Sequence, residues 1–123
     1  MIVNKVNKVS KITKWEVIKF QLVTYCFMHN IAITDSDLEC ATLLGYINGQ
    51  DLTNFCNLAS FEKKIFKSPQ TVRNCVSKME KLNLILRDSS NKRRIILNPL
   101  LDVQNQGNIL LDYKFIYIGT EEA

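Results

Sequence analysis

Four hydrogen-bonding side chains recur at helical spacing near the middle of the chain. They are an amide, a guanidinium, a second amide and a hydroxyl: Gln70, Arg73, Asn74 and Ser77. Spacings of three and four residues place side chains on one face of an α-helix. Such a face holds several donors and acceptors in a fixed array, which suits recognition of a polar surface by hydrogen bonds.

Basic and hydroxyl side chains surround this array in the sequence. They are Lys67, Ser68, Thr71, Lys78, Lys81, Arg87, Lys92, Arg93 and Arg94. The net charge of +4 is unevenly distributed, because residues 61–99 carry +7 and residues 21–60 carry −4. This asymmetry is typical of a module that binds a polyanion. The alternative is that these Lys and Arg side chains only solvate a surface helix and a hairpin.

The elements that must position these side chains are a helix over residues 69–82 and a hairpin over residues 84–97. Ser68 can cap the helix and Pro69 suits its first turn, while Asn83 can adopt the left-handed conformation that ends it. The apolar face of the helix consists of Val72, Cys75, Val76, Met79 and Leu82. Turn-forming residues at 88–91 separate the expected strands 84–86 and 93–97, which Asn98-Pro99 close.

Three further helices are expected before this region. The first spans 14–29 and is apolar nearly all round, so both of its sides should be buried, one of them by a partner subunit. The second spans 38–47 and is preceded by capping-box spacing at Ser36 and Glu39. Asp51 caps the third, whose helical pattern continues through residues 61–65.

The two ends of the chain differ in character. Residues 1–13 form a basic arm, which could pack on its own domain, contact a partner or follow a phosphate backbone. Residues 109–118 are strand-like, with Tyr113, Phe115 and Tyr117 on one face. This strand could complete a small sheet with the hairpin, or it could reach another subunit in a homo-oligomer.

No arrangement of residues in the sequence indicates catalysis, a metal site or a cofactor. There is no Gly-rich phosphate loop, and His29 with Cys26 forms a lone Cys-x-x-His pair without the second pair that a structural zinc ion needs. The four cysteines are interpreted as reduced core thiols. No apolar run is long enough to cross a bilayer and the N-terminus is polar, so a cytoplasmic protein with no membrane partner is expected.

Ser68-Pro69-Gln70-Thr71-Val72 opens the helix over 69–82, and Leu82-Asn83-Leu84-Ile85 closes it. With the hairpin that follows, this order resembles the second half of a winged helix-turn-helix domain. In that family a Ser-x-x-Thr-Val segment begins the recognition helix and a two-stranded wing follows. The family usually has Gly in the turn before the recognition helix and at the position of Asn83. Leu97-Asn98-Pro99 is similar to the end of the wing in small plasmid-type replication initiators.

The resemblance implies a mainly α fold with a small β-hairpin wing, in the α+β class. It would be a winged helix-turn-helix with an extra N-terminal helix and a C-terminal strand. The corresponding division of the chain is a basic arm at 1–13, a winged-helix domain at 14–99 and a C-terminal extension at 100–123, which could contact another subunit.

The resemblance also implies double-stranded DNA as partner, with helix 69–82 in the major groove. Arg can bond to guanine through two hydrogen bonds, and Asn or Gln to adenine, so Gln70, Arg73, Asn74 and Ser77 are the expected base contacts. Lys67, Ser68, Thr71, Lys78, Lys81, Arg87, Lys92, Arg93 and Arg94 are the expected backbone contacts.

The expected role is that of a transcription or replication regulator of a phage, plasmid or bacterium. The alternative is a winged-helix docking module that contacts other proteins, as a structural subunit of a larger assembly such as a phage particle. In that case the protein would be found in the virion.

Overall fold

The computed structural model describes residues 12–105, and it confirms the expected mainly helical fold with a small β component. The elements in chain order are α1 (Lys14–Met28), α2 (Asp35–Ile47), β1 (Gln50–Asp51), α3 (Leu52–Asn57), the π-helical turn η1 (Leu58–Glu62), α4 (Pro69–Lys81), β2 (Ile85–Arg87), β3 (Arg94–Leu97) and the 3₁₀ turn η2 (Pro99–Leu101). The expected arm 1–13 lies largely outside the described residues, and the expected strand 109–118 lies wholly outside them.

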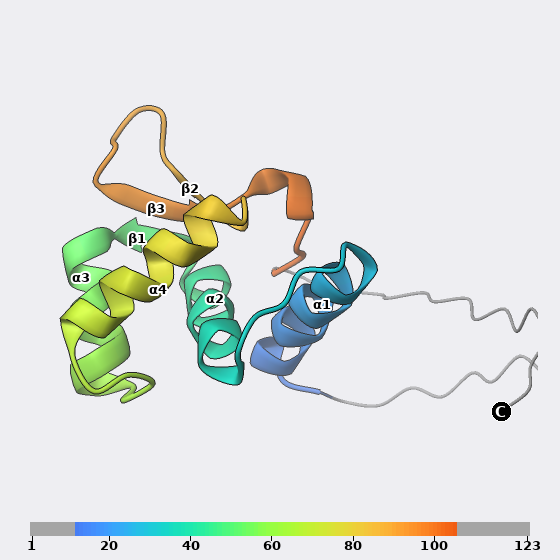
Figure 1. Ribbon diagram of the computed structural model, residues 1–123, viewed down its shortest axis with the longest axis horizontal. Coiled ribbons are helices and arrows are strands. Elements are labelled where there is room, and N and C mark those ends of the chain that lie inside the picture. Colours follow the sequence, from blue (N-terminus) through green and yellow to red (C-terminus); the bar gives the residue numbers. More distant parts are fainter. Residues whose placement is uncertain (1–11, 106–123) are drawn as a thin grey trace, which may run out of the picture.

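Helix α2 lies at the centre of the molecule (Figure 1). It packs against α1 on one side and α4 on the other, and it also contacts β3. Helix α3 packs against α4 at the end of the molecule remote from α1. Consistent with this central position, α2 is buried along most of its length, whereas α1 buries only Ile18, Leu22 and Cys26.

The predicted start of the second helix is wrong. Helix α2 begins at Asp35, and its capping box joins Thr34 and Asp37 instead of Ser36 and Glu39. The Thr34 hydroxyl accepts from the Asp37 N–H at 3.1 Å, and the Asp37 carboxylate accepts from the Thr34 N–H at 3.2 Å. The sequence contains both possible capping boxes, Thr34 with Asp37 and Ser36 with Glu39. The second does not form, and the Glu39 side chain is bonded to Lys19 of α1.

The predicted continuation of helix through residues 61–65 is confirmed only for residues 61 and 62, which belong to η1, and is wrong for residues 63–65. The chain leaves η1 after Glu62 and turns sharply at Lys64, whose φ is +55°. The N–H groups of Ile65 and Phe66 then bond back to the Ala59 carbonyl oxygen, at 2.9 and 3.5 Å. Lys64 therefore supplies the left-handed turn that Gly more often supplies.

We expect Lys64→Gly to raise the free energy of unfolding by about 0.5–1 kcal/mol, because Gly adopts a positive φ without the steric cost that a Cβ atom imposes. Lys63 is also exposed, but its φ is −88°, so Lys63→Gly should lower the free energy of unfolding by a similar amount. Urea unfolding of both variants measures the difference. Equal effects of the two substitutions would contradict the argument from backbone strain.

Helix α4 begins as predicted. The Ser68 side chain accepts from the Thr71 N–H, and Pro69 occupies the first helical position. The helix ends at Lys81, one residue earlier than predicted, and Asn83 has the expected left-handed conformation with a φ of +60°. The buried Asn98 fixes this corner, because its amide donates to the Asn83 carbonyl oxygen at 2.8 Å.

The hairpin forms with nearly the predicted bounds, but its sheet contains a third strand that the sequence did not indicate. Strand β3 lies between β1 and β2, and both pairings are antiparallel. The two-residue β1 pairs Gln50 with Ile95 and Asp51 with Arg94. Gly49 precedes it with a φ of +93°, and a Cβ atom there would lie 2.6 Å from Arg94 Nη2. Gly49 therefore supplies a positive φ immediately before β1, and its missing side chain leaves room for that of Arg94.

The segment after the sheet returns to the helices. Leu101 is buried in the common core. Gln104 and Gln21 of α1 exchange two hydrogen bonds, of 2.8 and 2.9 Å, between the side chain of Gln21 and the backbone of Gln104. The Asn105 amide donates to the Gly45 carbonyl oxygen of α2 at 3.0 Å. The chain is therefore held against α1 and α2 up to its last described residue.

Candidate nucleic-acid interface

Helix α4 has the two faces that its sequence predicted. Val72, Cys75, Val76 and Met79 are buried, and Leu82 packs at the margin of the core. The opposite face carries the four side chains predicted to contact bases. Gln70, Asn74 and Ser77 are exposed there, and Arg73 is half-buried. Burial of the apolar face against α2 and α3 thus fixes the direction in which the polar array points.

The side chains of the array bond to neutral neighbours. The Gln70 amide donates to the Asn74 side-chain oxygen at 3.0 Å. Arg73 Nη2 donates to the Thr53 hydroxyl of α3 at 3.3 Å. None of the ion pairs found among residues 12–105 includes Arg73. Its charge is therefore not neutralised by a carboxylate of the described chain.

A groove of about 480 Å³ lies where the start of α3, helix α4 and the hairpin meet. Its lining consists of Asp51, Leu52, Thr53, Arg73, Arg87, Lys92 and Arg93. A hydrogen bond of 2.8 Å from the Leu52 N–H to the Arg93 carbonyl oxygen holds α3 against the hairpin. Four cations and one carboxylate line this groove, so we call it the cationic groove.

The only acid of the cationic groove already has a structural role. The Asp51 carboxylate accepts from the N–H groups of Thr53 and Asn54, at 3.0 and 3.3 Å, and so caps α3 as predicted. Its charge is directed at backbone donors of α3. An anion in the groove would thus meet three or four cationic side chains and one carboxylate that is bonded elsewhere.

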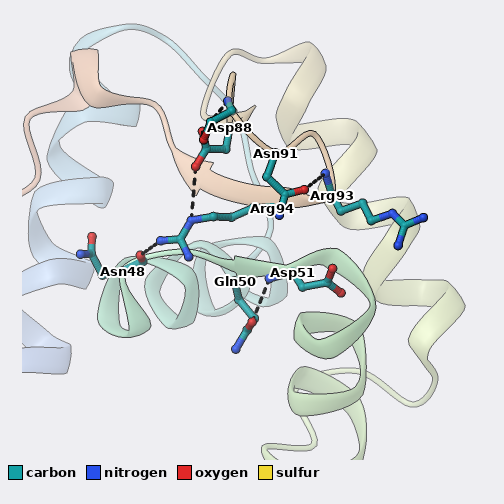
Figure 2. Close-up of polar contacts among 8 residues, drawn as sticks. Asn48, Gln50, Asp51, Asp88, Asn91, Arg93 and Arg94 are labelled. Carbon is teal, nitrogen blue, oxygen red and sulfur yellow. Dashed lines mark hydrogen bonds and ion pairs between the residues drawn. The ribbon is translucent and has the colours of Figure 1, made fainter.

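Three of the predicted backbone contacts are ion-paired within the chain. Lys78 bonds to the buried Asp37 of α2 at 2.6 Å. Arg87 forms two hydrogen bonds to Glu80 of α4, at 3.0 and 3.2 Å. Arg94 lies between Asp88, at 3.5 Å, and the Asn48 carbonyl oxygen, at 2.7 Å (Figure 2). These three cations hold the elements of the interface together.

The other four basic side chains predicted to contact the backbone are Lys67, Lys81, Lys92 and Arg93. All four are exposed, and none of them is ion-paired within residues 12–105. Figure 2 shows the side chain of Arg93 extending away from that of Arg94. The adjacent arginines therefore differ in their contacts: Arg94 is bonded to Asp88 and Asn48, whereas Arg93 is exposed and is not ion-paired within residues 12–105.

Ser68 and Thr71 lie together at the start of α4. Their hydroxyl oxygens are 2.9 Å apart, and the Ser68 oxygen also accepts from the Thr71 N–H. Thr71 is exposed and Ser68 is half-buried. The Ser68 side chain therefore caps the helix, and Thr71 is exposed at the surface.

Sequence reasoning missed two residues that shape this interface. The Thr53 hydroxyl accepts from Arg73, and the Glu80 carboxylate accepts two hydrogen bonds from Arg87, which joins α4 to β2. The spacing of Glu80 and Arg87 was visible in the sequence. Their contact depends on the tight turn at Asn83, which brings β2 back along α4.

The hairpin turn is organised by its own polar side chains. The Asp88 carboxylate accepts from both the N–H and the hydroxyl of Ser90, at 3.0 and 2.8 Å, and Asn91 accepts from the Arg93 N–H. These bonds from Ser90, with the charge of Arg94, lower the pKa of Asp88 below its ordinary value. Asp88 therefore stays ionised and offsets the charge of Arg94.

The four cysteines are buried and unbridged: Cys26, Cys40, Cys56 and Cys75. Burial raises the pKa of Cys26 and of Cys56. No group of three or more potential metal-binding side chains occurs within residues 12–105, and His29 stacks on Tyr25 at the end of α1. None of the described helices has the length and apolar character needed to span a bilayer.

Comparison of the chain with protein-family models, with curated proteins and with solved structures found no match. Function must therefore be inferred from the side chains and their geometry.

Proposed function

We propose that the protein binds double-stranded DNA as a winged helix-turn-helix module. Helix α4 enters the major groove, and the β2–β3 hairpin, the wing, lies on the sugar-phosphate backbone. The observation that carries this proposal is the cationic groove beside the exposed polar array of α4. The order of the elements supports it, because α3 takes the place of the positioning helix, α4 that of the recognition helix and β2–β3 that of the wing.

In this proposal the array of α4 supplies the specificity. Arg73 bonds to a guanine, while Asn74 and Gln70 exchange their mutual hydrogen bond for bonds to adenine, and Ser77 bonds to either base type. Lys67, Lys81, Lys92 and Arg93 bond to phosphates. Lys78, Arg87 and Arg94 position the helix and the wing through their acidic partners. A phage, plasmid or bacterial regulator acting in the cytoplasm would use such a module.

The salt dependence of DNA binding tests this division of the basic residues. Each phosphate neutralised on duplex DNA contributes about −0.9 to the slope of log affinity against log salt concentration. Four available cations thus predict a slope of about −3.6, shallower than the roughly −6 expected if all seven predicted basic side chains bound phosphates. Fluorescence anisotropy with random-sequence duplex DNA, over about 0.05–0.3 M salt, measures it.

Two single variants provide the matched comparison. Lys92→Ala should reduce the magnitude of the slope by about 0.9, whereas Lys78→Ala should leave the slope unchanged because its charge is paired with Asp37. Equal slopes for these two variants would contradict the assignment of roles. No binding of the parent protein at the lowest salt concentration would overturn the proposed function itself.

A protein-docking function is the second candidate, and the surface of α1 favours it. Phe27 and Met28 are 83% and 69% exposed. Large exposed apolar side chains that lie together often mark a protein contact. In this alternative the chain is a subunit of a homo-oligomer or of a larger particle, held through α1 or through the C-terminal strand. A defined oligomer that binds no DNA would favour this candidate.

A further inference from the structure

The π-helical turn η1 and the loop that follows it form a surface at the start of α4. Figure 1 shows this loop at one end of α4 and the β2–β3 hairpin at the other. Phe61 is 66% exposed there and borders a groove of about 550 Å³. The groove is lined by Ser60, Phe61, Lys64, Ile65, Phe66 and Lys67. We call this groove, with the neighbouring Lys63, the η1 surface.

The backbone of the η1 surface has two uncommon conformations. Residues Leu58–Glu62 are π-helical, and Lys64 has a φ of +55°. Both π-helical turns and non-glycine residues at positive φ are found frequently at functional sites. The turn at Lys64 allows the next two N–H groups to bond back to a carbonyl oxygen of η1. The loop is thereby closed over η1, and the residues that follow Lys64 form part of the wall of the groove.

That part of the wall is apolar. Ile65 and Phe66 are half-buried, because they pack against the common core and also line the groove. The volume of the groove lies in the range of about 300–1,000 Å³ that is typical of ligand pockets. An aromatic or large aliphatic side chain that entered the groove would be removed from water against Phe61, Ile65 and Phe66.

The rim of the groove is cationic. Lys63, Lys64 and Lys67 are exposed, and none of them is ion-paired within residues 12–105. Glu62 is the one acid of residues 61–67, which carry a net charge of +2. Uncompensated cations around an apolar groove complement a segment in which carboxylates flank an apolar side chain.

We propose that the η1 surface binds an acidic segment of a partner protein. One aromatic or large aliphatic side chain of that segment enters the groove beside Phe61, and carboxylates next to it pair with Lys63 and Lys64. A bilayer is flat and does not reach the half-buried side chains within the groove. A nucleic-acid strand satisfies the lysines, but the polar edges of its bases would lose hydrogen bonds to water against an apolar wall. The apolar groove and its cationic rim together favour a protein.

Selection of short random peptides tests the proposal with the full chain. A phage-displayed library is first depleted on the Phe61→Ser/Lys64→Gly variant and then selected on the parent protein. Gly retains the positive φ of the loop, so this variant lacks the aromatic ring and one cation of the η1 surface but keeps its turn. We expect enriched peptides in which Asp or Glu flanks an aromatic or large aliphatic residue. No enrichment, or enriched peptides without acidic residues, would overturn the proposal.

The affinity of an enriched peptide, measured by fluorescence anisotropy, identifies the side chains that bind it. Phe61→Ser should weaken binding about tenfold, because truncation of a central aromatic contact is costly. Lys64→Gly should weaken it about threefold, as expected for an exposed ion pair. Phe27→Ser is the matched control and should leave the affinity unchanged, since Phe27 is 83% exposed but lies on α1, away from the η1 surface. Equal affinities of the Phe61→Ser and Phe27→Ser variants would contradict the proposal.

Anionic membranes, single-stranded nucleic acid and a second copy of the chain are the competing occupants. Sedimentation with vesicles that contain phosphatidylserine, anisotropy with a single-stranded oligonucleotide and sedimentation velocity of the protein alone measure these three interactions. Any of them that Phe61→Ser abolishes would overturn the proposal in favour of that occupant. Neither Phe61 nor Lys64 is a proposed DNA contact, so both variants should bind duplex DNA as the parent protein does. Failure of the proposed function is therefore distinguishable from failure of this inference.

Discussion

Replacing Arg73 and Arg93 together with alanine should lower the affinity for a preferred duplex site about 100-fold at moderate salt. Arg73 is proposed to bond to a base, and the loss of such a contact costs about 1–3 kcal/mol. Arg93 is exposed, has no acidic partner within residues 12–105 and is proposed to bond to a phosphate. The two residues line one groove, so their contributions need not add independently. Anisotropy titrations with specific and random duplexes measure both effects.

Arg73→Ala and Arg93→Ala should affect binding to specific and to random DNA differently. Arg73→Ala should weaken binding to the preferred site and leave binding to random DNA nearly unchanged, because a base contact carries sequence information. Arg93→Ala should weaken binding to all sequences alike and reduce the salt slope by about 0.9. An equal loss for both variants on both duplexes would contradict the separation of base and phosphate contacts.

A double variant elsewhere controls for net charge. Lys14→Ala with Lys19→Ala removes the same charge from α1, where Lys19 is paired with Glu39 and Lys14 lies over the ring of Tyr46, 4.9 Å from its centre. If DNA binds through the cationic groove, this control should lower affinity much less than the Arg73 and Arg93 variant. A comparable loss would indicate that DNA binding depends on overall charge and not on the groove.

The sequence predicted the helices and turns that depend on residues close together in the chain. Helical spacing identified both faces of α4, and Ser68 and Asn83 marked its ends, because capping and left-handed conformations depend on neighbouring residues. Lys64 gave no such signal, since lysine adopts a positive φ only when tertiary contacts require it. Strand β1 is two residues long and was missed because it exists only through its pairing with β3.

The sequence predicted which residues lie at the candidate site, but not which partners their side chains bond to. Periodicity placed Lys78 near the polar face of α4, but it could not show that Asp37, 41 residues earlier, lies within reach. The Thr53 hydroxyl that accepts from Arg73 and the Asn48 carbonyl that accepts from Arg94 are likewise 20 and 46 residues away in sequence, although the acidic partner of Arg94, Asp88, is close in sequence. Whether a surface cation is available to a ligand depends on such distant partners, and a sequence pattern contains no information on them.

Replacing Asp37 with alanine should lower the free energy of unfolding by about 2 kcal/mol, because one carboxylate joins α2 to α4 and caps α2 as well. Asp37 is buried, with 5% of its surface exposed. It accepts from Lys78 at 2.6 Å, from the Cys75 thiol at 3.1 Å and from the Thr34 N–H. The nearby Cys40, burial and the Asp37 carboxylate raise the pKa of Cys75, so the thiol keeps the proton that it donates.

Asp35→Ala is the matched control in the same helical turn. Asp35 is exposed, and no hydrogen bond or ion pair of its side chain is found within residues 12–105, so its replacement should change stability by less than about 0.5 kcal/mol. Urea unfolding at neutral pH measures both variants. Loss of the Asp37 carboxylate should also tilt α4 and so weaken DNA binding, although Asp37 itself is directed into the core. Similar midpoints for the two variants would contradict a linking role for Asp37.

The pH dependence of the stability difference between the parent protein and Asp37→Ala tests whether the ionised carboxylate is the stabilising form. Burial by itself would raise the pKa of Asp37, but the hydrogen bonds from Lys78, Cys75 and Thr34 outweigh it and hold the pKa below the ordinary value of 3.8. A carboxyl whose pKa is lowered by folding contributes stability above its unfolded pKa and loses that contribution as pH falls through its folded pKa. The difference between the parent protein and Asp37→Ala should therefore be constant from neutral pH to about pH 5 and shrink below about pH 4. A difference that grew on acidification would mean that protonated Asp37 is the stabilising form, and the ion pair with Lys78 would then not hold α2 and α4 together.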